Sequence, residues 1–284
     1  MLVLILFPLL NALSVAAGNV LGGVATRRQP LALVMVVSAP VSLAISLALA
    51  LVDGNPPASA AIGVGMLAGA IGGIGLPLAY RAFAIGPAGV AGSIVACVST
   101  GLLASAGIAT GTSASPSRLA GLAVCTGAVI LVSLRGKQDS PPTSRVILPA
   151  VLAGAAFAGF ALILNTAQPG AGSWPVFGVR LGVVGITVVL FLVTAAIRGR
   201  RALLAQVTPT GVLLSAAVGV MDATGNLFLL LALRGGDLVL VALLTSTAPI
   251  YAALLAWLLL KERLSRTQFS GLALAAVGLA LAAV

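Results

Sequence analysis

Two charged side chains, Arg180 and Asp222, lie well inside long apolar segments, where nearly every other charged residue of the 284-residue chain lies between such segments. At 1.5 Å per helical residue, they would sit ~10 and ~16 Å from the same membrane face, a gap that an arginine side chain can bridge. An isolated charge at mid-bilayer costs about 2.5–3.5 kcal/mol on insertion scales, so we expect a pair or a watery cavity. The functional interpretation is a substrate or proton site. The alternatives are an ion pair that locks two helices, or an Arg180 that snorkels outward.

Asp222 is the only carboxylate near mid-membrane, and Asn226 follows it at a spacing that puts both on one helix face. If transport is coupled to protons, Asp222 is the best candidate to carry the proton, because burial favours the neutral acid. An Arg180 partner would favour the charged form, so the two interpretations compete.

Other candidate substrate-binding residues are polar side chains within apolar segments: Asn11, Ser14, Thr245, Ser246 and Tyr251. Asn11 and Ser14 share a helix face, where hydrogen bonding between helices is the alternative to lining a cavity. Near Thr245 and Ser246, Pro249 removes one backbone hydrogen bond and should kink its helix, and hydroxyls can satisfy the freed groups.

Small residues recur at intervals of four, as Gly65, Gly69 and Gly73 in one segment and Gly178 and Gly182 in another. Such rows let helices approach closely, which predicts packing; a sliding interface for alternating access is the second interpretation. The two tryptophans, Trp174 and Trp257, stand near segment ends and are interpreted as membrane-interface anchors.

The composition places the chain in a membrane, since 60% of its residues are hydrophobic and 7% are charged. So little charge could not cover a surface in water. Histidine is absent and the two cysteines lack metal-ligand spacing, so we expect no metal site, no cofactor and no enzyme activity. The net charge of +10 is divided among short loops without aromatic interleaving, which argues against nucleic acid as a partner.

The elements that must position these residues are ten predicted membrane helices, since a bilayer core of ~30 Å needs about 20 helical residues. Their expected ranges are 2–24, 31–52, 60–83, 88–109, 118–134, 146–167, 174–197, 210–233, 238–260 and 267–284. The polar stretch 135–145 is interpreted as a linker between a first half, 1–134, and a second, 146–284.

The two halves are predicted to be repeats of five helices, and an odd number of helices places them in opposite orientations, as an inverted repeat. A shift of 148 residues overlays their motifs and sets Ile74 where Asp222 stands. With alternate loops on opposite sides, twelve Lys and Arg residues fall on one side and two on the other. The positive-inside rule then puts both termini outside.

The second half carries Thr245-Ser246-Thr247-Ala248-Pro249-Ile250, then Leu260-Lys261-Glu262-Arg263-Leu264, then Gly271 and Gly278. In these motifs it resembles the EamA-like family of the drug/metabolite transporter superfamily, well over 210–284 and in outline over the whole chain. The first half departs, since Gly101 replaces the proline and 111–115 holds no carboxylate. The resemblance implies two five-helix repeats, but also cytoplasmic termini, which conflicts with the charge count.

We therefore expect an all-α integral membrane protein of the cell membrane, multi-pass, with ten helices as two inverted repeats. Its expected function is secondary transport or export of small amphiphilic metabolites such as amino acids, by alternating access around a central cavity. A lipid or lipid-linked sugar translocase of the same fold is the alternative. The expected partners are a small-molecule substrate and membrane lipid, and a monomer and a homodimer are both compatible with the sequence.

Overall fold

The computed structural model describes residues 2–26, 28–85, 88–111, 115–133, 144–235 and 237–260, and a few separate positions from 267 to 278. These residues form the helices α1 (Leu2–Thr26), α2 (Leu31–Val52), α3 (Ser59–Ile85), α4 (Ala88–Ala109), α5 (Pro116–Ser133), α6 (Ser144–Asn165), α7 (Trp174–Arg198), α8 (Arg200–Leu204), α9 (Pro209–Leu233), α10 (Leu238–Thr245) and α11 (Ala248–Leu260), with a short 3-10 turn η1 (Pro169–Ala171).

Six of the helices are long and apolar enough to cross a bilayer: α1, α2, α3, α6, α7 and α9. Shorter apolar stretches occupy Ile94–Ala109, Leu119–Ala128 and Leu238–Ala252. The described part of the chain is thus an all-helical, multi-pass membrane protein. Eight of the predicted segments each match one helix closely, while most of the tenth, 267–284, lies outside the described residues. The linker predicted for 135–145 also lies outside them up to residue 143, and its last two residues belong to α6.

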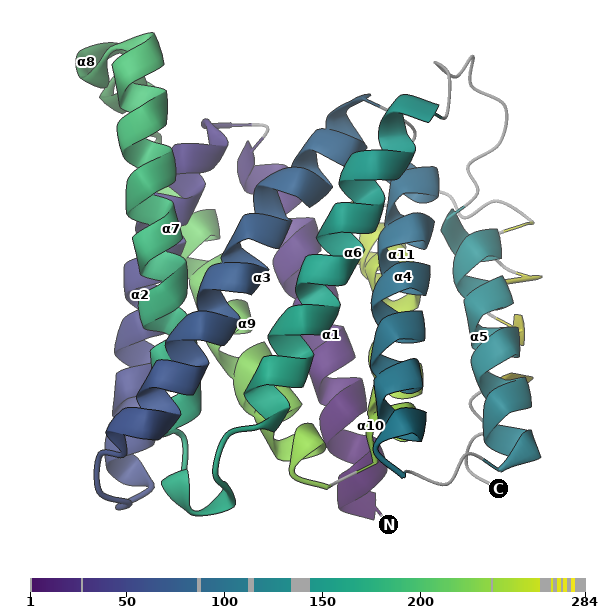
Figure 1. Ribbon diagram of the computed structural model, residues 1–284. Coiled ribbons are helices and arrows are strands. Elements are labelled where there is room, and N and C mark those ends of the chain that lie inside the picture. Colours follow the sequence, from purple (N-terminus) through teal and green to yellow (C-terminus); the bar gives the residue numbers. More distant parts are fainter. Residues whose placement is uncertain are drawn as a thin grey trace.

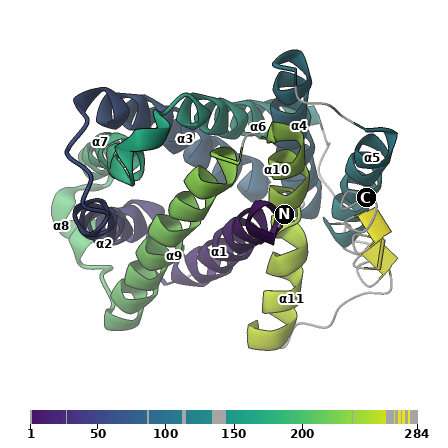
Figure 2. The same ribbon diagram turned by 90° about the horizontal axis from the view of Figure 1, so that it is seen from below.

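The helices stand side by side, with α8 at one end of the bundle (Figure 1). Seen along their axes, α1 and α9 pack together on one side and α3 and α6 on the other, while α2 and α7 join the two sides (Figure 2). The α10 and α11 helices pack on α1, and α4 packs on α6. The charged residues of α7 and α9 are therefore positioned by neighbours from both halves of the chain.

The predicted glycine rows pack against each other, which fixes α7 tightly on α3. A Cβ on Gly69 would lie 2.1 Å from the Val179 carbonyl oxygen, and a Cβ on Gly178 would lie 2.2 Å from the Ile62 carbonyl oxygen. No side chain fits in these positions, so the backbones of the two helices touch directly. The prediction that the rows serve close packing is confirmed, and the glycine row of α3 packs on the glycine row of α7.

The predicted ninth segment, 238–260, is two helices, because α10 ends at Thr245 and α11 begins at Ala248. The single continuous helix expected there is wrong in this respect, while the interruption expected from Pro249 is present. The Ser246 hydroxyl donates to the Leu243 carbonyl at 2.6 Å, and the Thr247 hydroxyl donates to the Leu244 carbonyl at 2.6 Å. The Ser246 bond supplies a donor to the Leu243 carbonyl at the break, and the Leu244 carbonyl accepts from both the hydroxyl and the backbone N–H of Thr247.

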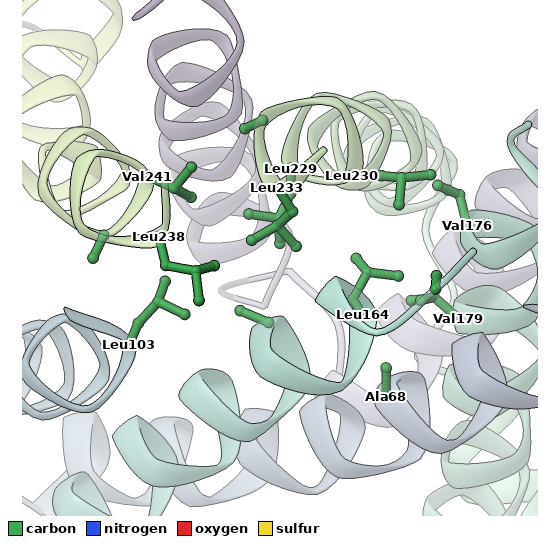
Figure 3. Packing of buried hydrophobic residues seen from close by; sticks show 14 of the residues in the cluster. Ala68, Leu103, Leu164, Val176, Val179, Leu229, Leu230, Leu233, Leu238 and Val241 are labelled. Atoms are coloured by element: carbon green, nitrogen blue, oxygen red, sulfur yellow. The ribbon is translucent and has the colours of Figure 1, made fainter. Parts of the chain in front are cut away.

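One end of the bundle is closed by an apolar cluster, drawn in Figure 3, that joins helices from both sides. Leu229 and Leu233 of α9 belong to this cluster with Leu164 of α6. Val176 of α7 lies beside Leu230, and Leu238 of α10 lies on the side of Leu233. The cluster lies where α6 and α9 end and where α7 and α10 begin. Among the clusters of described residues, this one alone links α9 to α3 and α6.

Candidate functional site

Arg180 of α7 and Asp222 of α9 form an ion pair inside the bundle. The Nη1 of Arg180 donates to Oδ2 of Asp222 at 2.8 Å, and Nη2 donates to the backbone carbonyl oxygen of Asp222 at 3.1 Å. The Arg180 side chain is therefore turned inward to α9, and the expected pairing is what the geometry shows. The alternative in which Arg180 snorkels outward is wrong for this conformation.

Asp222 lies on the inner face of α9. It is three residues from Gly219, which packs on Val41 of α2, and three residues from Gly225, which packs on Ser14 of α1. Each step of three residues turns about 60° around a helix, so Asp222 faces the gap between these two contacts. Leu213, which is 72% exposed, lies nine residues away and thus about 180° around the helix, toward lipid.

The two members of the pair differ sharply in exposure, since the Arg180 side chain is 2% exposed and the Asp222 side chain is 47% exposed. Because Asp222 faces inward, the space beside its carboxylate is not filled by protein. The buried Nε of Arg180 has no hydrogen-bond partner among the described residues. A molecule in this space can therefore reach the carboxylate of Asp222, whereas the guanidinium of Arg180 is buried behind it.

Asn226 lies one turn from Asp222 on the same face of α9, as its spacing predicted. Its side chain is partly buried. The apolar cluster begins at Leu229, about 10 Å along α9 from Asp222. The polar face therefore ends against the closed end of the bundle.

Asn11 and Ser14, predicted as substrate-binding residues, lie in the contact between α1 and α9. The Asn11 side chain is 5% exposed, and its Nδ2 donates to the Gly225 carbonyl oxygen at 2.8 Å. Ser14 is 8% exposed, and its Cβ would be 3.3 Å from a Cβ on Gly225. This geometry matches the helix-to-helix hydrogen bonding that was the alternative interpretation for this face of α1.

The other three predicted binding residues lie outside the two helices, α7 and α9, that carry the ion pair. Thr245 and Ser246 are at the break between α10 and α11, and Tyr251 is on α11, which packs on α1 and α5. The Thr245 hydroxyl donates to the Val241 carbonyl oxygen at 2.7 Å, within its own helix. The structure therefore brings together Arg180, Asp222 and Asn226, while these three remain predictions at a separate place.

A polar cluster that the sequence did not predict ties three connections together at the closed end. The Ser173 hydroxyl donates to Oδ2 of Asp53, and Nε1 of Trp174 donates to the Asn55 carbonyl oxygen at 2.9 Å. Trp174 is 5% exposed, so it is not presented to lipid headgroups as an interface anchor. The nearest signal in the sequence is that 53–57 and 166–173 fall at the same end when helices alternate.

Arg234, just beyond α9, completes this cluster by donating from Nη2 to the Gly172 carbonyl oxygen. Desolvation lowers the pKa of Arg234, and the negative charge of Asp53 partly opposes that shift. The guanidinium stays charged at any physiological pH, so the cluster works as a fixed electrostatic clasp.

A bundle of membrane-length helices around an inward-facing ion pair defines an integral membrane protein with an internal polar site. Residues 136–284, more than half of the chain, match the EamA-like transporter family. The chain belongs to this family, and the predicted resemblance is confirmed.

Two further comparisons bear on the fold. A search of curated proteins gave no significant match. A solved crystal structure of a protein aligns with a TM-score of 0.74 at 16% identity, covering 98% of this chain and 96% of its own. At this identity, the likeness shows the fold alone.

Proposed function

We propose that the protein is a secondary transporter of small amphiphilic metabolites, such as amino acids, that works by alternating access around the Arg180–Asp222 site. The observation that carries the proposal is an inward-facing carboxylate, held by a buried guanidinium and 47% exposed, in a chain of a transporter family. A charge in such a position marks a substrate or ion pathway more often than a purely structural element. Asp222 also remains the candidate for proton coupling.

We propose that residues 1–134 and 146–284 form an inverted repeat, in which rocking of the two halves would expose a central site to each side in turn. This proposal is supported by contacts between the halves that recur with the roles of the halves exchanged. A Cβ on Gly219 would lie 2.5 Å from the Ser38 carbonyl oxygen, as one on Gly69 would lie 2.1 Å from the Val179 carbonyl oxygen. The α9 and α3 positions differ by 150 (219 − 69), and the α7 and α2 positions differ by 141 (179 − 38).

A second pair of contacts supports the same offsets. A Cβ on Gly18 would lie 3.6 Å from Met221, and one on Gly159 would lie 3.5 Å from Ile71. Here too the differences are 150 (221 − 71) and 141 (159 − 18). We propose offsets of 150 and 141 in place of the single shift of 148 taken from the sequence.

With these offsets, the counterpart of Asp222 is Gly72 instead of Ile74, and the counterpart of Arg180 is Ala39. Ile74 is 50% exposed and lies on the outer face of α3, which does not match the inner position of Asp222. The first half thus offers two small residues where the second half holds the ion pair.

Helix α1 begins at the closed end, while several basic residues of the described part of the chain lie at the opposite face, namely Arg28, Arg81, Arg198, Arg200 and Arg201. We propose that this basic face is cytoplasmic, with both termini outside, in the cell membrane. The conformation would then be closed to the outside by the apolar cluster and its clasp. The family's usual description has cytoplasmic termini, and labelling of an N-terminal tag in intact cells decides between the two.

The proposal is tested by uptake of radiolabelled amino acids into proteoliposomes, comparing wild type, Asp222→Asn and Thr224→Val. Thr224 is two residues away on α9, and its hydroxyl bonds to its own helix, so it serves as a matched control. Uptake that is lost in Asp222→Asn and kept in Thr224→Val supports the assignment. Wild-type rates in Asp222→Asn would remove Asp222 from the site, and lipid flipping without metabolite uptake would favour the translocase.

A further inference from the structure

We propose that Asn19 of α1 and Asp222 of α9 form two walls of one water-accessible site for a ligand that carries a protonated amine. In this site Arg180 is a positioning residue that presents the Asp222 carboxylate. The inference rests on the proposed transport function and names the group that its site recognises.

The contact between α1 and α9 places Asn19 beside Asp222. Gly225 packs on Ser14 and Met221 packs on Gly18, so the two helices run antiparallel. In antiparallel helices, the residues that follow a contacting pair turn to the same side of the contact, and ~3 Å separates them along the axis. Asn19 follows Gly18, and Asp222 follows Met221.

Exposure along α1 agrees with this placement. Val15, Asn19 and Gly23 are all exposed and fall four residues apart, on the strip that turns toward Asp222. Leu6 and Leu13, 44% and 39% exposed, lie on the opposite side of α1 and face lipid. Two exposed polar side chains, Asn19 and Asp222, therefore border the same unfilled space from neighbouring helices.

The chemistry of this space favours a cation. A ligand meets the exposed part of the Asp222 carboxylate, which accepts hydrogen bonds, and the Asn19 amide, which accepts through its oxygen. The guanidinium of Arg180 is 2% exposed and already bonded twice to Asp222, so a ligand carboxylate cannot reach it without breaking the pair. An ammonium group gains a charge-assisted bond here, whereas an anion meets like charge.

Cysteine accessibility tests the inference without any transport assay. In a chain whose only two cysteines, Cys97 and Cys125, are replaced by alanine, Asn19→Cys is exposed to cationic aminoethyl or anionic sulfonatoethyl methanethiosulfonate in membrane vesicles. We expect both reagents to modify Asn19→Cys. Adding Asp222→Asn removes one charge at ~7 Å, which changes the two rates about threefold in opposite directions, so their ratio falls by about tenfold.

Two further variants keep this result interpretable. Leu13→Cys, on the lipid side of α1, should react with neither reagent. Val15→Cys, one turn from Asn19 on the same strip, repeats the measurement if Asn19→Cys does not fold. The shared site would be overturned if Asn19→Cys or Val15→Cys folds but does not react. It would also be overturned if Asp222→Asn leaves the ratio of the two rates unchanged.

Protection tests the ligand class. We expect n-butylamine to slow the modification of Asn19→Cys several-fold and n-butyrate to leave it unchanged. Equal protection by both compounds, protection by butyrate alone, or protection by neither would overturn recognition of an amine. A protein that transports nothing can still show the expected accessibility, so failure of the proposed function and failure of this inference remain distinguishable.

Discussion

Removing either member of the Arg180–Asp222 pair should destabilise the protein, but by unequal amounts. Asp222→Ala leaves a guanidinium that is 2% exposed without its carboxylate, whereas Arg180→Met leaves a carboxylate that is 47% exposed. Water can reach the carboxylate from its open side, and it cannot reach the guanidinium. The cost of losing the partner should therefore fall mainly on the aspartate variant.

The magnitudes follow from the contacts. Removing one partner of a buried ion pair costs about 3–5 kcal/mol. Because Nη2 of Arg180 also bonds to the backbone oxygen of residue 222, which Asp222→Ala keeps, we expect the lower end, about 3 kcal/mol. Arg180→Met breaks a pair whose acid is half exposed and should cost about 1 kcal/mol. The double variant removes both charges and should lose about 1 kcal/mol, which gives a coupling of about 3 kcal/mol.

The assay is SDS-driven unfolding in mixed micelles, followed by circular dichroism, for wild type, both single variants and the double variant. Thr224→Val, also on α9, controls for substitution in that helix. Equal losses in the two single variants, or a larger loss in Arg180→Met, would refute the idea that the exposure difference sets the cost. A double variant whose loss equals the sum of the single losses would show that the two side chains do not stabilise each other.

Two other substitutions test packing and the clasp by the same unfolding assay. Gly69→Ala would place a Cβ 2.1 Å from the Val179 carbonyl oxygen, so the helices must separate, and a loss of about 3 kcal/mol is expected; Gly63→Ala, with no atom within 4 Å, should be neutral or stabilising. Ser173→Ala removes the hydroxyl that donates to the Asp53 carboxylate, and we expect a loss of about 1.5 kcal/mol. A neutral Gly69→Ala or an unchanged Ser173→Ala would show that the contact in question contributes nothing.

Helix positions could be predicted from the sequence because lipid imposes a simple demand. A segment that spans the bilayer needs about 20 apolar residues, and polar connections such as 27–30 and 53–57 separate them. The break in the ninth segment has a local cause, and the length of the apolar segment does not predict it. Residues 238–244 are apolar throughout, and the hydroxyls of Ser246 and Thr247 stabilise the break.

The ion pair could be predicted for a similar reason, since two opposite charges in lipid at similar depth have few other arrangements. The helix that packs on each glycine row could not be predicted, because a row of small residues indicates a close contact without identifying the other helix. The clasp was beyond the sequence too, since Asp53 and Ser173 are 120 residues apart and neither stands in a distinctive pattern. Asn11 could be placed on a helix face, but choosing between cavity and helix contact needed the position of Gly225.

The proposed repeat shows how the two sides of the site differ. Where α9 and α1 carry Asp222 and Asn19, the offsets of 150 and 141 place Gly72 of α3 and Phe160 of α6. A Cβ on Gly72 would lie 3.3 Å from Phe160, so an aromatic ring fills on α3 and α6 the space that stays open between α9 and α1.

A ligand between the α1–α9 pair and the α3–α6 pair would therefore meet polar groups on one wall and apolar surface on the other. Such a wall arrangement matches an amphiphile with one cationic end, because its ammonium group can face Asp222 while its apolar part lies against Phe160. If this is correct, Phe160→Ala should weaken protection of Asn19→Cys by n-butylamine far more than protection by methylamine, which has almost no apolar part. Equal weakening of both would mean that Phe160 shapes the helices without contacting the ligand.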